Sequence, residues 1–133
     1  MNNPITQSTN NPIKKGKIYD IHERIFQWVI QVINYTKSLP TNPQNLVIIP
    51  QITKSVSSVG ANDQEADAAN SRKDFIAKYA IARKECKETI YWLRVIIATN
   101  PRNFHEEGKQ LIGEGTEIMF VVSKIMSNTR NKV

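Results

Sequence analysis

Apolar side chains recur along this chain at alternating spacings of three and four residues, the pattern that amphipathic helices produce. The longest such stretch follows Ser71, a residue type that caps helix N-termini, and stops at Asn100 and Pro101. Its apolar seam consists of Phe75, Tyr79, Ala82, Cys86, Thr89, Leu93 and Ile96. The pattern predicts a helix over residues 72–99.

A second helix is predicted over residues 20–39. Asp20 and Glu23 form a capping box at its start, and Pro40 ends it. Its apolar residues occupy two adjacent stripes, so the apolar arc is wider than contact with a single helix requires. We therefore expect this helix to contact several neighbours or a second subunit.

The same spacing predicts two more helices, over residues 43–69 and 103–128. Asn42 and Pro43 supply an N-cap and a first-turn proline for the former, and Pro50 is expected to kink it. The last helix carries three glycines, which lower helix propensity by up to about 1 kcal/mol each or allow close approach of another helix. They are Gly108, Gly113 and Gly115.

Four amphipathic helices with short connections and no strand pattern predict an all-α fold. The expected architecture is an antiparallel up-down-up-down four-helix bundle over residues 18–130. The preceding residues are rich in Asn, Thr, Pro and Lys and have little to bury, so we interpret residues 1–17 as a flexible leader.

A length of 133 residues suits one domain with its own core. The sequence lacks an apolar run of about 20 residues that could cross a bilayer, and its beginning lacks the apolar centre of a signal peptide. Its single cysteine, Cys86, excludes an intrachain disulfide. We therefore expect a cytoplasmic protein with no membrane partner.

The net charge of +6 favours a polyanionic partner such as RNA or DNA. Helix 72–99 carries seven basic against three acidic residues. The candidate phosphate-binding residues are Arg72, Lys73, Arg83, Lys84, Lys87 and Arg94, with Lys54 from the preceding helix. The alternative is a solvated face, in which pairs such as Lys84 with Glu88 neutralise one another. We identify no stacking aromatics interleaved with these residues, so sequence-specific recognition is not expected.

Polar residues near the boundary between helix 43–69 and helix 72–99 form a candidate network that sets the packing between helices or subunits. Such partners are needed because a buried unpaired charge costs on the order of several kcal/mol. The residues are Asn62, Glu65, Lys78, Glu85 and Glu88. A ligand site and plain solvent exposure are the alternatives.

Three aromatic residues are candidates for a subunit interface. Tyr91 and Trp92 are adjacent and cannot both face one core, so one of them is expected to cover a subunit contact, with Trp28 as its counterpart. Burial inside a monomer is the alternative.

The sequence contains no recognisable catalytic or metal-binding constellation. His22 and His105 lack the glutamate three positions earlier that di-iron bundles require, and both are interpreted as surface groups. Cys86 lies on the apolar seam and is interpreted as a buried, inert thiol. Phosphate loops and nucleophile elbows are absent from the sequence. We expect a non-enzymatic protein that uses no cofactor or metal.

Residues 58–94 resemble the core motif of the four-helix-bundle proteins encoded in intervening sequences of bacterial 23S ribosomal RNA genes. The first part of the motif is Ser-Val-Gly-Ala-Asn-Asp-Gln-Glu-Ala at residues 58–66. The second part comprises Asp74, Phe75, Ile76, Lys78, Ile81, Ala82, Lys84, Glu85, Glu88, Thr89, Tyr91, Trp92 and Leu93. Weaker similarity covers residues 19–39 and 111–129. The sequence departs from the family at Thr53 and Lys54, near positions where relatives often carry arginines, and at Gly113 and Gly115, where better helix formers are usual.

The resemblance implies short bundles that assemble as rings, typically pentamers. The family is similar to the accessory variability determinant protein of diversity-generating retroelements, a barrel-shaped pentamer that binds nucleic acid and a reverse transcriptase. We therefore expect a homo-oligomer that binds RNA or DNA electrostatically through its basic face. The alternative is a scaffold for another protein, for example a reverse transcriptase.

Overall fold

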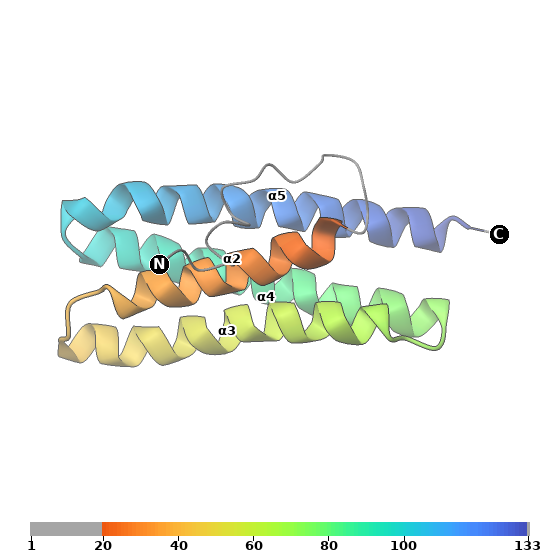
Figure 1. Ribbon diagram of the computed structural model, residues 1–133, viewed down its shortest axis with the longest axis horizontal. Helices are drawn as coiled ribbons and strands as arrows, with labels where there is room; N and C mark the ends of the chain where they lie inside the picture. The colour runs from red at the N-terminus through yellow and green to blue at the C-terminus, as the bar shows by residue number, and fades with distance from the viewer. Residues whose placement is uncertain (1–19, 133) are drawn as a thin grey trace, which may run out of the picture.

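The computed structural model describes residues 20–132 as four long helices and one short helix, with no strand among these residues. Helix α2 spans Asp20–Lys37, α3 spans Pro43–Asp67, α4 spans Arg72–Thr99 and α5 spans His105–Arg130. A 3-10 turn, η1, spans Arg102–Phe104 directly before α5. Successive long helices run in opposite directions (Figure 1). The predicted all-α four-helix bundle is confirmed, and the predicted leader, residues 1–17, lies outside the described residues.

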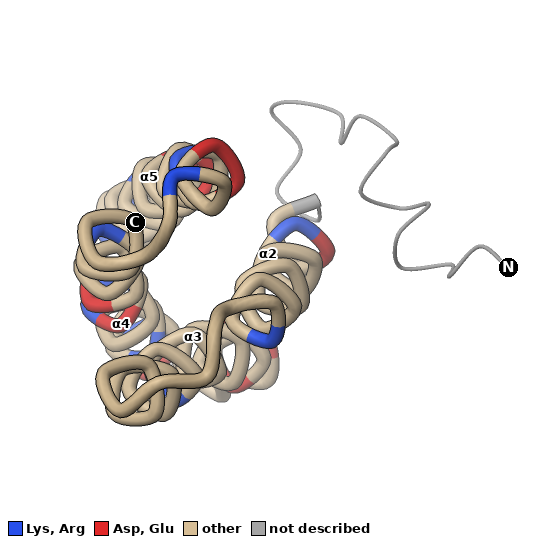
Figure 2. Tube along the Cα trace, turned by 90° about the vertical axis from the view of Figure 1, so that its left-hand side faces the viewer, with Lys and Arg blue, Asp and Glu red and all other residues tan. Residues whose placement is uncertain are grey.

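Viewed along its long axis, the bundle places each helix beside its neighbours in the sequence, with α2 and α5 completing the circuit (Figure 2). One cluster of buried apolar residues lies between the four helices. Its largest fully buried side chains are Trp28, Tyr35 and Tyr79, which come from α2 and α4. Removal of each such side chain from water stabilises the fold by roughly 2–3 kcal/mol.

Two of the predicted helix caps are present, at Asn42 and Ser71. Asn42 accepts a hydrogen bond from the backbone N–H of Asn45 at 2.8 Å, and Ser71 accepts one from Asp74 at 3.0 Å. The Asn45 side chain also donates to the amide oxygen of Asn100 at 2.9 Å. This contact holds the start of α3 against the end of α4.

The helix ends differ slightly from the predicted ones because tight turns intervene. After Lys37 the backbone N–H groups of Ser38 and Leu39 bond to carbonyls three residues back, so α2 ends before the predicted residue 39. The segment before α5 forms the 3-10 turn rather than the first turn of an α-helix. Helix α3 passes through Pro50 without ending and stops at Asp67.

The indole of Trp28 occupies the centre of the bundle against a glycine of α5. Trp28 is 0% exposed, and its Nε1 donates to the carbonyl oxygen of Leu111 at 2.9 Å. A Cβ atom at Gly115 would lie 2.6 Å from Trp28 Cζ2 and 3.2 Å from Ile90. The predicted interface role of Trp28 is therefore wrong, because the absence of a side chain at Gly115 lets the indole pack inside the monomer.

Gly108 and Gly113, the other two glycines of α5, have different surroundings. A Cβ at Gly108 would meet the hydroxyl of Tyr35 at 2.6 Å and Ile97 at 2.7 Å, so this glycine also permits close packing. That hydroxyl donates to the carbonyl oxygen of Phe104 at 2.8 Å, and burial raises the pKa of Tyr35 to about 12. A Cβ at Gly113 would meet nothing within 4 Å. The proposed role of the glycines in close helix approach thus holds for Gly108 and Gly115 but not for Gly113.

The single thiol lies inside the bundle, as predicted. Cys86 is 1% exposed, and its Sγ donates to the carbonyl oxygen of Gly115 at 3.3 Å. Burial raises the pKa of Cys86 to about 12, so the thiol stays protonated at neutral pH. This environment suits a packing residue and opposes a role as a nucleophile.

Candidate nucleic-acid interface

Four of the predicted phosphate-binding residues project from the outer surface of α4. Lys84, Lys87 and Arg94 follow one another at spacings of three and seven residues, and Lys73 lies eleven residues before Lys84, so all share one side of the helix. All four are exposed. The adjacent helix α5 contributes two exposed lysines, Lys109 and Lys124. We refer to the six residues Lys73, Lys84, Lys87, Arg94, Lys109 and Lys124 as the basic face.

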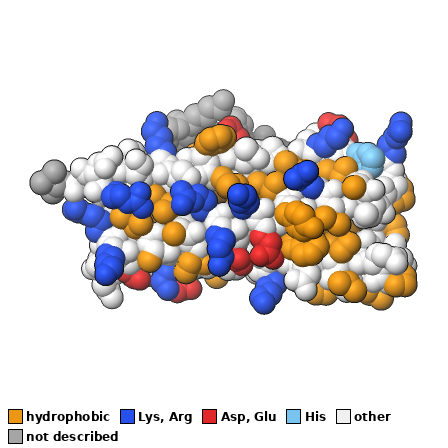
Figure 3. All heavy atoms as spheres, turned by 180° about the vertical axis from the view of Figure 1, so that it is seen from behind, with side chains coloured by type: hydrophobic (Ala, Val, Ile, Leu, Met, Phe, Trp, Pro, Cys, Tyr) orange, Lys and Arg blue, Asp and Glu red, His pale blue; other side chains and the backbone are white. Residues whose placement is uncertain are grey.

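Helix α4 lies toward the rear of the bundle in Figure 1, and Figure 3 shows the molecule from that side. Lys and Arg side chains are spread along this view, with apolar surface and some acidic side chains between them. Within residues 20–132, none of the six has a carboxylate within 4.0 Å. The predicted pair of Lys84 with Glu88 does not form.

The remaining candidates lie elsewhere or have other contacts. Arg83 is half-buried and its Nη1 donates to Ser123 Oγ at 3.2 Å, which joins α4 to α5. Arg72 donates to the backbone carbonyl oxygen of Lys132 at 2.6 Å. Lys54 is exposed, but it belongs to α3 and so lies outside the basic face.

Several acidic residues lie on other flanks of the same helices. On α4, Asp74 and Glu85 lie four residues before and seven residues after Lys78, which forms an ion pair with Glu65 of α3 at 3.0 Å. They therefore lie on the side of α4 that faces α3. On α5, Glu114 points to α2, where Arg24 donates to its two carboxylate oxygens at 2.7 and 2.8 Å. Two exposed acidic residues lie closer to the basic face: Glu88 of α4 is four residues after Lys84, and Glu117 of α5 is seven residues before Lys124. The separation of positive and negative groups is therefore partial.

The polar residues predicted to form one network between α3 and α4 do not form one. Of the five predicted residues, only Lys78 and Glu65 contact each other across the two helices, and the hydrogen bond from Lys78 to Glu65 raises the pKa of Lys78. Asn62 bonds back to Ser58 of its own helix. Glu88 accepts a hydrogen bond from Trp92 on α4. The backbone carbonyl of Glu85 accepts a hydrogen bond from the Thr89 hydroxyl on the same helix.

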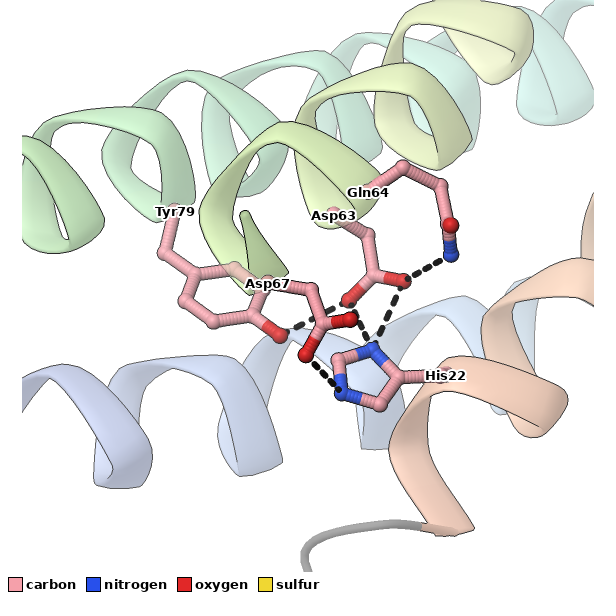
Figure 4. A network of polar contacts seen from close by, with 5 residues as sticks. All are labelled: His22, Asp63, Gln64, Asp67 and Tyr79. Carbon is pink, nitrogen blue, oxygen red and sulfur yellow. Dashed lines mark hydrogen bonds and ion pairs between the residues drawn. The ribbon is translucent and has the colours of Figure 1, made fainter. Parts of the chain in front are cut away.

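A different polar cluster, centred on Asp63, connects three helices (Figure 4). Asp63 is 1% exposed and accepts a hydrogen bond from the Tyr79 hydroxyl of α4 at 2.7 Å. Nδ1 of His22 on α2 lies 3.0 Å from both of its carboxylate oxygens. On the other side of the imidazole, Nε2 lies 3.4 Å from Asp67. Burial and then the bond to Asp63 raise the pKa of Tyr79, so its hydroxyl remains a hydrogen-bond donor.

The interpretation of His22 as a surface group is therefore wrong, because the imidazole is fixed between two carboxylates of α3. The sequence does contain a signal for this cluster. Asp63 continues the buried stripe of α3 at spacings of four and three residues, after Ile52, Val56 and Val59. A carboxylate at a core position requires partners, and His22 and Tyr79 supply them.

A shallow groove of about 740 Å³ adjoins this cluster between α2 and α3. Its wall includes His22, Asp63, Gly60 and Phe26, and the Phe26 side chain is 50% exposed. In residues 20–132, no set of three or more His, Cys, Asp or Glu side chains is arranged to hold a metal ion. The groove thus offers no metal ligand set from these residues.

The sequence profile of the 23S rRNA-intervening sequence proteins matches residues 17–124. The chain belongs to this family. A structural comparison finds a crystal structure from Bacteroides thetaiotaomicron, described as a protein of unknown function from the S23 ribosomal protein family. It is 34% identical, with a TM-score of 0.71, and the match covers 80% of the present chain and 97% of that chain. No curated protein matches the chain.

As a 23S rRNA-intervening sequence protein, the chain shares its fold with a relative along almost that relative's full length. The family match includes α2, α3 and α4 entirely and most of α5, so both helices of the basic face fall within it. Among residues 20–132, no helix is long and apolar enough to cross a membrane.

Proposed function

We propose that this family member binds nucleic acid, RNA or DNA, through the basic face and catalyses no reaction. The observation that supports the proposal is the cluster of exposed cations on α4. They have no carboxylate partner within residues 20–132, and two of the three acidic residues of the helix, Asp74 and Glu85, lie toward α3. Between Lys73 and Arg94 the helix extends roughly 30 Å, enough to follow several successive phosphates.

Reversing two charges of the basic face should weaken binding and reduce its salt dependence. We expect Lys84→Glu/Lys87→Glu to lower affinity for an oligonucleotide by at least about tenfold at roughly 50 mM salt, because two phosphate contacts become repulsive. The slope of log affinity against log salt should become less negative by roughly 1.5–2. Fluorescence anisotropy at several salt concentrations measures both quantities.

A matched control changes the net charge equally at other exposed lysines. Lys37→Glu/Lys54→Glu acts on the end of α2 and on α3, outside the basic face. This variant should lose much less affinity than Lys84→Glu/Lys87→Glu. Equal losses would show a non-local effect of net charge, and wild-type binding that ignores salt would contradict the proposal.

We also propose that the protein assembles with copies of itself as a pentamer, the state that the family resemblance implies. Exposed apolar side chains support this proposal, since Leu46 and Val47 near the start of α3 are 63% and 65% exposed. Light scattering should give a mass of about five times the 15.2 kDa of one chain. A mass of one chain would contradict assembly. It would leave the same apolar residues as a docking surface for a different protein, such as a reverse transcriptase.

A further inference from the structure

We propose that the basic face takes single-stranded nucleic acid and that Tyr91 and Phe120 are its base-stacking platforms. This inference rests on the proposed function and adds the class of ligand. Tyr91 lies within the line of basic residues on α4, four residues after Lys87 and three before Arg94. Its side chain is 53% exposed. The expectation that no aromatic residue interleaves with the basic residues is therefore wrong.

A second aromatic side chain emerges from α5. Phe120 is 68% exposed, the highest value among the large apolar residues of the described chain, and it lies four residues before Lys124. A phenyl ring so exposed contributes little to the stability of one chain, since it buries little area. It is available instead for contact with a flat apolar ligand.

The rings of Tyr91 and Phe120 lie at similar positions along the long axis of the bundle. Arg83 contacts Ser123, which relates positions on α4 to positions on the antiparallel α5. Phe120 lies three residues from Ser123 and Tyr91 lies eight from Arg83, in the same axial direction. At 1.5 Å per residue, the rings are roughly 8 Å apart along the axis, on adjacent helices. One flexible strand can reach both while its phosphates contact the lysines beside them.

The Tyr91 ring is held in place rather than free to collapse onto the helix. Its ring centre lies 5.0 Å from that of Trp92 in an edge-to-face arrangement, with 70° between the planes. Trp92 packs against the core, and its Nε1 donates to Glu88 Oε2 at 3.2 Å. A platform that is already ordered loses little side-chain entropy when a base stacks on it.

Exposed aromatic rings among cations favour an unpaired strand over a duplex. In a duplex the faces of the bases are stacked on one another, so the rings gain nothing beyond the phosphate contacts. In a single strand each base offers a free face, and stacking on an aromatic side chain adds roughly tenfold or more in affinity per base. Because every base has such a face, this recognition tolerates many sequences.

The test compares the full chain with two double variants. Tyr91→Leu/Phe120→Leu keeps apolar side chains but removes both rings, whereas Tyr91→Phe/Phe120→Tyr keeps both rings. Anisotropy is measured with a short single-stranded DNA, the RNA of the same sequence, and the duplex DNA. Light scattering gives the mass of each protein. The RNA and DNA arms establish which sugar is preferred.

We expect the wild type to bind the single strands more tightly than the duplex. The leucine variant should lose about tenfold or more on single strands, with the salt slope and duplex affinity unchanged, and the ring-preserving variant should bind as the wild type does. Equal binding of single strands by all three proteins would overturn the stacking role alone. Loss of mass in the leucine variant, with equal losses for single strands and duplex, would assign the rings to self-contact instead. A wild type that binds no oligonucleotide would overturn the proposed function as well.

Discussion

Replacing Asp63 with alanine should lower the free energy of unfolding by about 3 kcal/mol. The carboxylate is buried and accepts hydrogen bonds from Tyr79 and His22, so its loss leaves the Tyr79 hydroxyl inside the bundle without its acceptor. The substitution also removes the shorter of the two contacts between His22 and α3. Urea denaturation followed by circular dichroism measures the loss.

Variants of Tyr79 and Asp67 test whether the loss of stability comes from the hydrogen bond between Asp63 and Tyr79. Tyr79→Phe removes the stranded donor, so the double variant Asp63→Ala/Tyr79→Phe should be more stable than the sum of the single effects predicts, by about 1 kcal/mol or more. Asp67→Ala is the control, because Asp67 is 64% exposed and lies 3.4 Å from the imidazole, and it should cost less than about 1 kcal/mol. Strictly additive effects of Asp63 and Tyr79 would mean that the hydrogen bond contributes nothing.

Two alanine substitutions only two residues apart on α5 should have opposite effects. Gly115→Ala should lower the free energy of unfolding by about 2 kcal/mol, because its Cβ would lie 2.6 Å from the Trp28 ring in a fully packed core. Gly113→Ala should raise it by up to about 1 kcal/mol, because that Cβ meets nothing and alanine favours the helix. Thermal and urea midpoints of the two variants measure the contrast.

Gly108→Ala gives an independent check, since its Cβ would meet Tyr35 and Ile97 at 2.6–2.7 Å. It should resemble Gly115→Ala in sign. If all three alanine variants were more stable than the wild type, the close approach of α5 to α2 and α4 would be wrong.

The helices could be predicted from the sequence because each leaves a local pattern. The seam of α4 and the caps at Asn42 and Ser71 depend only on residues a few positions apart, and the structure has them as predicted. The site depends on contacts between helices, which such patterns do not specify. Whether Trp28 faces the core or a partner is decided by Gly115, a residue 87 positions away in the sequence.

The candidate interface was partly predictable for the same reason. Spacing along α4 was enough to place Lys84, Lys87 and Arg94 on one side. The position of Arg83, whose guanidinium contacts Ser123 between α4 and α5, depends on how α5 packs. Spacing also places Tyr91 on this side of α4, between Lys87 and Arg94, although it was predicted to lie in a subunit contact.

The cluster of cations on the outer side of α4 gives the molecule an uneven distribution of charge across its width. A polyanion approaching from solution is attracted most strongly to that side, so productive encounters share one orientation. The same cations act between copies of the chain. Two lysine-bearing sides repel one another, so an assembly that keeps the basic face free for its ligand has to join the copies through other sides.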